Sequence, residues 1–249
     1  MAVAAEEAAR AAGQLLRSRP HEVRSKKSAV DFVTEVDLAS EARVREVLGA
    51  RTPGVPIQGE EQGGVATGTR WCVDPLDGTT NFVHGYPAYC VSIALIEGAT
   101  PVVGVIYDPI HDELYRAWRG GGATVNGAPI AVSEMPTVAD MLCVTGFPND
   151  FREGAPTFLA YVERAIRGTH GLRRSGSAAM DLATVARGRI DFFWEFRLKP
   201  WDTSAGYVLV TEAGGVVTRL DGTAWDPDAP VILASNGRDH EGIVRLLGG

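Results

Sequence analysis

Residues 71–82 read Trp71-Cys72-Val73-Asp74-Pro75-Leu76-Asp77-Gly78-Thr79-Thr80-Asn81-Phe82. An apolar run leads there into two carboxylates three residues apart, Asp74 and Asp77, and then into a Gly-Thr-Thr turn. Carboxylate oxygens are hard anionic ligands, and they suit Mg²⁺ or Mn²⁺ far better than zinc or copper. The stretch therefore predicts a site for a hard divalent cation.

The residues around the two carboxylates predict a phosphate site beside the cation. Pro75 fixes φ and lacks an amide hydrogen, so it should end the preceding strand and turn the Leu76 carbonyl outward as a third oxygen ligand. Gly78 lets the backbone approach a ligand closely, and Thr79 and Thr80 add hydroxyls. A helix that begins here would also offer unpaired amide hydrogens to a phosphate. A capped Asp-Gly turn is the better explanation of an isolated Asp-Gly-Thr, but the full string is more specific.

Two further acidic segments strengthen this prediction. The sequence Gly-Glu-Glu at residues 59–61 follows a breaker-rich stretch at 53–56, where a loop can direct either Glu60 or Glu61 toward a metal. Asp202 lies just before an apolar helical stretch. Its position suits a metal ligand and a helix cap equally, and the sequence leaves both readings open.

Taken together, these segments resemble the inositol monophosphatase family of magnesium-dependent, lithium-sensitive phosphatases. The family pattern is also visible as DFVTEVD at residues 31–37, RSGSAA at 174–179 and VTEAGG at 210–215. The matching motifs run in order from about residue 27 to residue 218. The continuation at residues 81–87 and 91–95 is similar to the inositol-phosphatase branch rather than to the nucleotidase or histidinol-phosphatase branches.

The resemblance implies two or three Mg²⁺ ions, for which Mn²⁺ is a possible substitute. Glu60, Asp74 and the Leu76 carbonyl would hold the first ion, and Asp74, Asp77 and Asp202 the second. Two cations suit phosphomonoester hydrolysis, because one lowers the pKa of an attacking water and the other stabilises the leaving alkoxide. No covalent phosphoenzyme is expected.

The resemblance also assigns roles in catalysis and substrate binding. Thr79, backed by Asp37, would orient the attacking water, and Glu60 would help to accept its proton. Glu195 would read the hydroxyls of a polyol. A helix cap explains the small residues at 176–178 equally well. The implied catalytic set is Glu60, Thr79, Asp77 and Asp37, and the implied substrate contacts are Gly78, Thr79, Thr80, Gly176, Ser177, Ala178, Glu195 and Asp202.

The expected reaction is hydrolysis of a small phosphorylated polyol, with myo-inositol 1-phosphate as the favoured substrate. Residues 196–201 read FRLKPW, and such bulky and cationic side chains can admit a second phosphate. Fructose 1,6-bisphosphate and histidinol phosphate are therefore alternative substrates. A different class of function is a regulatory or scaffold protein that keeps a structural metal site. The full set of residues argues against that class, because a structural site would not need the water-orienting Thr79.

The composition of the 249 residues excludes several other classes of function. The net charge of −7 argues against binding to nucleic acid or to an anionic membrane surface. Three cysteines without a Cys-x-x-Cys spacing are expected to be reduced and buried. No basic leader or apolar run of membrane-spanning length is present. We therefore expect a cytoplasmic enzyme.

The pattern of apolar residues predicts an α/β protein. We expect helices at residues 2–17, 37–48, 156–167, 177–187, 203–213 and 240–247. Short strands with tight turns between 89 and 132 predict an antiparallel sheet. Strands at 141–145, 190–194, 216–219 and 231–234 alternate with helices and predict a mainly parallel sheet. We expect an α+β subdomain at 1–133 and an α/β subdomain at 134–249. The resemblance implies a layered α-β-α-β-α sandwich that forms a homodimer.

Overall fold

The structure is a computed structural model that describes the backbone of residues 1–18, 25–26, 32–33, 35–147 and 151–248. Side chains are described for 1–18, 35–147 and 155–248. Asp31 and Thr34 of the motif at 31–37 lie outside the described residues. Two short strands, β1 (Ser25–Lys26) and β2 (Phe32–Val33), pair antiparallel before the second helix begins.

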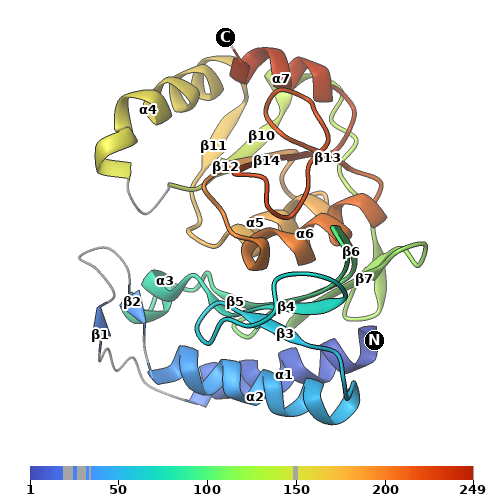
Figure 1. Ribbon diagram of the computed structural model, residues 1–249. Coiled ribbons are helices and arrows are strands. Elements are labelled where there is room, and N and C mark those ends of the chain that lie inside the picture. Colours follow the sequence, from blue (N-terminus) through green and yellow to red (C-terminus); the bar gives the residue numbers. More distant parts are fainter. Residues whose placement is uncertain (19–24, 27–31, 34, 148–150, 249) are drawn as a thin grey trace.

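The elements stack in five layers, in the order α-β-α-β-α (Figure 1). Helices α1 (Ala2–Ser18) and α2 (Glu35–Arg51) cover the outer face of the first sheet. Helices α5 (Ala178–Ala186) and α6 (Pro200–Glu212) lie between the two sheets. Helices α4 (Phe151–Gly168) and α7 (His240–Gly248) cover the second sheet. The predicted fold class and layering are therefore confirmed.

The first sheet has seven strands in the order β3-β4-β5-β6-β7-β8-β9. Its neighbouring strands are antiparallel except for the parallel pair β3 and β4. The antiparallel pairing predicted between residues 89 and 132 is confirmed. The strands are β3 (Ile57–Gly59), β4 (Arg70–Asp77), β5 (Cys90–Glu97), β6 (Thr100–Asp108), β7 (Glu113–Trp118), β8 (Ala123–Val125) and β9 (Ala128–Ile130).

One prediction for this sheet is wrong, because β4 does not end at Pro75. The strand continues to Asp77, with a shift of register between Asp74 and Asp77. Asp74 pairs with Ser92 and Asp77 with Cys90, so three steps along β4 match two steps along β5. A bulge of this kind leaves an unpaired residue, and a proline without an amide hydrogen is tolerated there.

The bulge decides which way the two carboxylates face. Residues three apart on a regular strand point to opposite faces of a sheet, because side chains alternate with a period of two. Here the extra residue restores a common face, since the partners Ser92 and Cys90 are two residues apart on β5. Asp74 and Asp77 can therefore both face the middle layer of the sandwich.

The second sheet has five strands in the order β11-β10-β12-β14-β13. The expectation of a mainly parallel sheet is wrong, because two of the four pairs of neighbouring strands are antiparallel. Strand β10 is parallel to β11 and β12, but β14 is antiparallel to both β12 and β13. Strand β14 returns from β13 without an intervening helix, which permits antiparallel pairing. The strands are β10 (Leu142–Thr145), β11 (Gly171–Arg173), β12 (Phe192–Phe196), β13 (Val216–Thr218) and β14 (Val231–Ser235).

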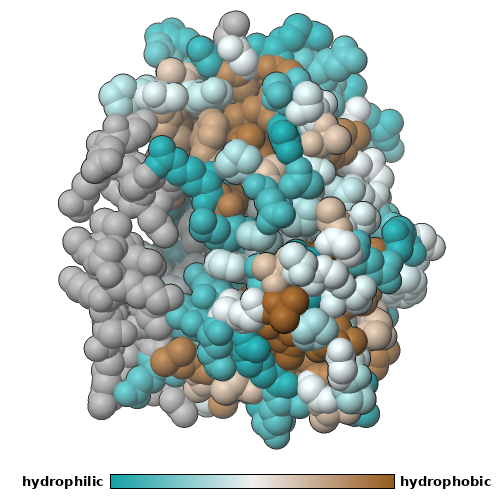
Figure 2. All heavy atoms as spheres, viewed as in Figure 1, coloured by the Kyte–Doolittle hydropathy of each residue, from teal (hydrophilic) through white to brown (hydrophobic). Residues whose placement is uncertain are grey.

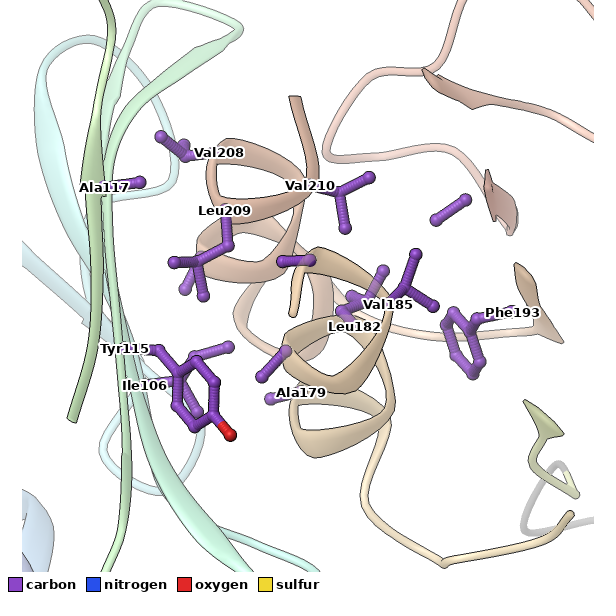
Figure 3. Close-up of a cluster of buried hydrophobic side chains, with 14 of the residues drawn as sticks. Ile106, Tyr115, Ala117, Ala179, Leu182, Val185, Phe193, Val208, Leu209 and Val210 are labelled. Carbon is purple, nitrogen blue, oxygen red and sulfur yellow. The ribbon is translucent and has the colours of Figure 1, made fainter. Parts of the chain in front are cut away.

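The middle helices share a hydrophobic core with both sheets (Figure 3). Leu209 of α6 points toward the strands of the first sheet, and Val185 of α5 points toward Phe193 of β12. A Cβ at Gly104 would lie 2.3 Å from the Ala205 carbonyl oxygen, so α6 rests directly on the backbone of β6. This core joins the two halves of the chain, and the proposed division at residue 133 stays a prediction.

The helices of the described residues are all too short or too polar to cross a membrane. The face of the molecule in Figure 2 carries separate hydrophobic areas among hydrophilic and neutral side chains.

Candidate active site

A cavity of about 400 Å³ lies where the middle layer meets the bulged end of β4. Its walls come from both halves of the chain. Asp37 does not line it, and neither does Glu61, the alternative to Glu60 that the sequence left open. The predicted residues on its walls are Glu60, Asp74, Leu76, Asp77, Gly78, Thr79, Thr80, Gly176, Ser177, Ala178, Glu195 and Asp202.

The two carboxylates of β4 are held by hydrogen bonds within the protein. Asp74 is 2% exposed, and its Oδ1 accepts from the Leu76 amide at 3.0 Å. Asp77 Oδ2 accepts from Ser177 Oγ at 2.7 Å and from the Ala179 amide at 2.6 Å. Asp77 therefore ties the bulge of the first sheet to the N-terminus of α5.

Asp202 has both of the roles that the sequence left open for its position. It lies in the first turn of α6, and its Oδ2 accepts from the Lys199 amide at 2.6 Å, which is a helix cap. The Asp202 side chain also lines the cavity, where Asp77 and Asp74 lie close enough to change the pKa of Asp202. A carboxylate has two oxygens, so capping leaves acceptor capacity for a ligand.

Burial raises the pKa of all four carboxylates on one side of the cavity, which we call the acidic wall: Glu60, Asp74, Asp77 and Asp202. Burial is the largest cause of the raised pKa of Glu60 and of Asp74, and the neighbouring carboxylates add to it. Burial also raises the pKa of Asp77. The pKa of Asp202 is raised to about 7 by burial and by the charge of Asp77. Such a concentration of carboxylates in one buried place favours binding of a cation.

The donor set fits Mg²⁺, since it consists of carboxylate oxygens and one backbone carbonyl. In the part of the chain that the structure describes, no three Asp, Glu, His or Cys side chains converge on a single point as ligands. The predicted second set of Asp74, Asp77 and Asp202 lies on one cavity wall, where the three carboxyl groups interact with one another. Asp77 and Asp202 each also accept a hydrogen bond from a protein donor. The two ligand sets stay predictions.

We predict that Asp202→Asn stabilises the metal-free protein more as the pH rises from about 4 to about 7. Below its ordinary pKa of 3.8, Asp202 is protonated in both the folded and the unfolded state. Between pH 3.8 and about 7 the carboxyl of Asp202 keeps its proton in the folded protein but loses it in the unfolded chain. The free energy of unfolding of the wild type therefore falls as the pH rises through this range. Asn does not titrate and can keep the capping bond.

The measurement is the thermal unfolding of both proteins in EDTA at several pH values. The Tm of the variant minus that of the wild type should increase over this range. A constant or falling difference would contradict the assignment of a raised pKa to Asp202. Saturating Mg²⁺ should remove the pH dependence of the difference, because the cation then compensates the charge of the ionised carboxylate.

Thr79 is the first residue of α3 (Thr79–His84), and it contacts the predicted partner Asp37. Its Oγ1 lies 3.1 Å from Asp37 Oδ1 and 3.0 Å from the Leu76 carbonyl oxygen. Asp37 is 1% exposed and lies in the first turn of α2. Gly78, which directly precedes Thr79, has a φ of 96°. A Cβ at this position would lie 2.8 Å from the Ala88 carbonyl oxygen, so glycine is required.

Glu195 lies in β12 and is 7% exposed. Burial, followed by the charge of Asp181, raises its pKa well above the ordinary value. A Cβ at Gly146 would lie 2.1 Å from Glu195 Oε1, so the absence of a side chain at position 146 makes room for the carboxyl group. Glu195, which is expected to bind the hydroxyls of a polyol, therefore lines the same cavity as the acidic wall.

Sequence reasoning missed Gly146 and Phe147 of this cavity, and it gave no role to Arg174, the first residue of the motif at 174–179. Strands β10 and β12 are parallel neighbours, with Thr145 opposite Trp194. Residues that follow the two strands therefore meet at one edge of the sheet, and the carboxyl ends of parallel strands are common ligand sites. The predicted strand at 141–145 contained this signal.

The family model for the inositol monophosphatase family matches residues 1–248. The chain belongs to this family. Its members are phosphoric monoester hydrolases that act on phosphorylated inositol and are generally Mg²⁺-dependent. The inositol monophosphatase of Anabaena (Nostoc) sp. PCC 7120 superposes with a TM-score of 0.91 at 45% sequence identity, over 99% of this chain and 94% of that chain.

Two relatives of this inositol monophosphatase family member carry other names. The Escherichia coli protein named Nus factor SuhB is 43% identical over 86% of this chain and 83% of its own length. The Aquifex aeolicus protein named fructose-1,6-bisphosphatase/inositol-1-monophosphatase is 38% identical over 96% of this chain and 92% of its own length. Membership of the family thus establishes the phosphatase class and leaves the substrate to be argued from the site.

Proposed function

We propose that this phosphatase hydrolyses a small polyol monophosphate, with myo-inositol 1-phosphate as the preferred substrate. The observation that carries the proposal is a single cavity that joins the acidic wall to Thr79 and to the buried Glu195. The acidic wall is the place for cations, Thr79 lies beside it, and Glu195 offers acceptor oxygens to hydroxyl groups. A phosphate ester of a polyol needs all three.

Two or three Mg²⁺ ions, held by Glu60, Asp74, the Leu76 carbonyl, Asp77 and Asp202, would lower the pKa of a water and stabilise the charge on the leaving oxygen. The protein side chains orient that water. Thr79 Oγ1 can give its hydrogen to Asp37, which leaves the oxygen lone pairs of the hydroxyl to accept from a water. Glu60, whose pKa is raised by burial, would accept the proton that this water loses.

The start of α3 would hold the phosphate group. The first amides of a helix lack partners inside the helix, and Gly78, Thr79 and Thr80 all line the cavity. Ser177 and Ala178 face the same space from the start of α5. Glu195 would accept hydrogen bonds from the hydroxyls of the polyol, which selects sugars and cyclitols over apolar alcohols.

A second candidate substrate is a sugar bisphosphate such as fructose 1,6-bisphosphate. Arg174, Arg197 and Lys199 line the cavity together with the acidic wall, so one space contains places for cations and for a second anion. The guanidinium of Arg174 lies over the ring of Phe147 at 5.1 Å from its centroid. Stacking of this kind holds a guanidinium in one orientation and leaves its N–H groups available for a phosphate.

We predict that Arg174→Met lowers kcat/KM for fructose 1,6-bisphosphate by about 10- to 100-fold, which is the loss of one or two charge-assisted hydrogen bonds. Activity toward inositol 1-phosphate should change several-fold less, since that substrate has one phosphate. Arg173→Met is the matched control, because Arg173 is the exposed neighbour and does not line the cavity. Equal losses with both substrates would remove the second-anion assignment.

The deciding test is phosphate release from a panel of inositol 1-phosphate, fructose 1,6-bisphosphate, histidinol phosphate and adenosine 3′,5′-bisphosphate. Each is measured as kcat/KM with Mg²⁺ and with EDTA. A preference for inositol 1-phosphate with strict Mg²⁺ dependence supports the proposal. A preference for fructose 1,6-bisphosphate supports the second candidate. Negligible turnover of the whole panel would contradict both candidates and support a non-catalytic regulatory or scaffold protein with a structural metal site.

We further propose a cytoplasmic homodimer that Li⁺ inhibits. The support for the compartment is that Cys72, Cys90 and Cys143 are all buried free thiols. Light scattering coupled to size exclusion tests the dimer, and an assay with added Li⁺ tests inhibition.

The net charge of −7 supports the expectation of no binding to nucleic acid. A mobility-shift assay tests that expectation, which matters because one relative is named as a Nus factor.

A further inference from the structure

Glu41 is a fully buried carboxylate in the middle of α2, outside the cavity. Its side chain points at the loop that follows β3. Oε2 accepts from the Glu61 amide at 2.8 Å, and Oε1 accepts from the Gln62 amide at 3.2 Å. These are the two amides directly after Glu60, so Glu41 fixes the backbone at the point where Glu60 enters the cavity wall.

Arg45, one helical turn further along α2, completes the contact. Its Nε donates to Glu41 Oε1 at 2.8 Å. A terminal nitrogen of its guanidinium donates to the Gly63 carbonyl at 2.7 Å, and the other reaches the Ile57 carbonyl at 3.5 Å. The guanidinium therefore compensates the charge of Glu41 and binds the loop both before and after Glu60.

Gly59 makes this approach possible. A Cβ at position 59 would lie 2.2 Å from Glu41 Oε1 and 2.4 Å from its Cδ. The backbone φ of Gly59 is not positive, so the requirement for glycine is one of space rather than of conformation. The Gly-Glu sequence at residues 59–60 is thus explained by two different needs. The glycine admits Glu41, and the glutamate faces the cavity.

The loop needs a firm attachment because Glu60 faces like charges. Asp202, Glu61 and Asp37 all repel its carboxylate, and Asp74 lies within hydrogen-bonding reach. The backbone holds the loop at its ends, since the Glu60 amide donates to the Val73 carbonyl at 3.1 Å and the Gly59 amide to the Gly63 carbonyl at 2.9 Å. Between these bonds, the Glu61 and Gln62 amides donate to Glu41, so this side chain opposes a displacement of Glu60 by the repulsion.

We propose that Glu41 and Arg45 are positioning residues that hold Glu60 ready for a divalent cation, so that the affinity for this cation depends on them. The inference rests on the proposed function, in which Glu60 is a ligand. Groups that orient ligands from behind typically contribute about 10- to 100-fold in metal affinity.

The test is Glu41→Gln, assayed by calorimetric titration of the substrate-free protein with Mn²⁺. Gln keeps the size and one acceptor oxygen but presents an NH₂ group to donors of Arg45 and the loop. We expect the dissociation constant for Mn²⁺ to rise about tenfold or more. The Mg²⁺ concentration for half-maximal activity should rise in parallel, while KM at saturating Mg²⁺ changes much less.

Glu46→Gln is the matched control, since Glu46 lies on the same helix in an exposed ion pair with Arg43. It should bind Mn²⁺ like the wild type. A role in folding alone would lower the Tm of Glu41→Gln and leave its Mn²⁺ affinity unchanged, and that result overturns the inference. If the wild type binds no Mn²⁺, the proposed metal site itself fails.

A second variant covers the case in which Glu41→Gln does not fold. Arg45 is 25% exposed, so Arg45→Met is expected to fold and to lose the bonds to Gly63 and Glu41. It should also weaken Mn²⁺ binding by about tenfold. Mn²⁺ affinity equal to that of the wild type in this variant would overturn the inference independently of Glu41.

Discussion

Replacing Asp74 by Asn is expected to lower kcat/KM by about 10³- to 10⁴-fold, which corresponds to about 4 to 5.5 kcal/mol of transition-state stabilisation. Asp74 is the most enclosed carboxylate of the acidic wall, at 2% exposed, and the charges of Glu60, Asp77 and Asp202 all act on it. It is the one residue common to both predicted ligand sets. Its loss should therefore weaken every predicted cation site together.

The same substitution is expected to stabilise the protein when no metal is present. Asn removes one of several buried like charges, and its Oδ1 can still accept from the Leu76 amide. In EDTA at pH 8 the Tm of Asp74→Asn should exceed that of the wild type, and Mg²⁺ should raise it less. This combination of lost activity and gained stability separates a cation site from a structural role.

Glu241→Gln is a suitable control for both measurements, since that side chain is 93% exposed and far from the acidic wall in the chain. It should leave kcat/KM and the response of Tm to Mg²⁺ unchanged. Activity of Asp74→Asn within tenfold of the wild type at saturating Mg²⁺ would rule out Asp74 as the shared ligand.

The second large effect is expected at Thr79. Thr79→Val keeps the shape of the side chain but removes the hydroxyl between Asp37 and the cavity. We expect kcat to fall by about 10²- to 10³-fold, since a positioned group that handles the attacking water contributes at this level. KM should change little, because the amides that would bind the phosphate stay in place.

Thr79→Ser is the conservative counterpart. Its hydroxyl can still donate to Asp37 Oδ1, and the fold of α3 does not depend on the missing methyl group. We expect it to keep kcat within about tenfold of the wild type, given the size of hydrogen-bond effects. Steady-state kinetics of both variants with inositol 1-phosphate decide the matter. If Val is tolerated as well as Ser, the hydroxyl has no part in orienting water.

Local patterns in the chain were sufficient for most elements. Helices α1, α2, α5, α6 and α7 begin or end within a few residues of the predicted bounds, because periodicity, caps and glycines act within one or two turns. One of the tight turns expected between residues 89 and 132 lies at Asn126-Gly127, where both residues have a positive φ. The acidic motifs were recognised for the same reason, since their chemistry is carried by residues close together in sequence.

Other features depended on contacts between distant segments. The sequence predicted a strand end at Pro75, but pairing with β5 carries β4 on as a bulge to Asp77. The sequence also predicted a mainly parallel second sheet, but β14 inserts antiparallel between β12 and β13. Strand order and direction depend on which elements bury each other, and that information is not local.

The site likewise has features that the sequence indicated and features that only the fold decided. Residue types and spacing indicated Asp74, Asp77 and Thr79, because hard oxygen donors and a hydroxyl suit the expected chemistry, and the resemblance to the inositol monophosphatase family selected Glu60 and Asp202. Folding supplied the bond from Ser177 to Asp77, the space that Gly146 leaves for Glu195, and the attachment of the Glu60 loop to Glu41. Each of these joins residues at least 20 positions apart. Chemistry is a property of side chains and can be read along the chain, whereas their positions depend on packing across two sheets and the helices between them.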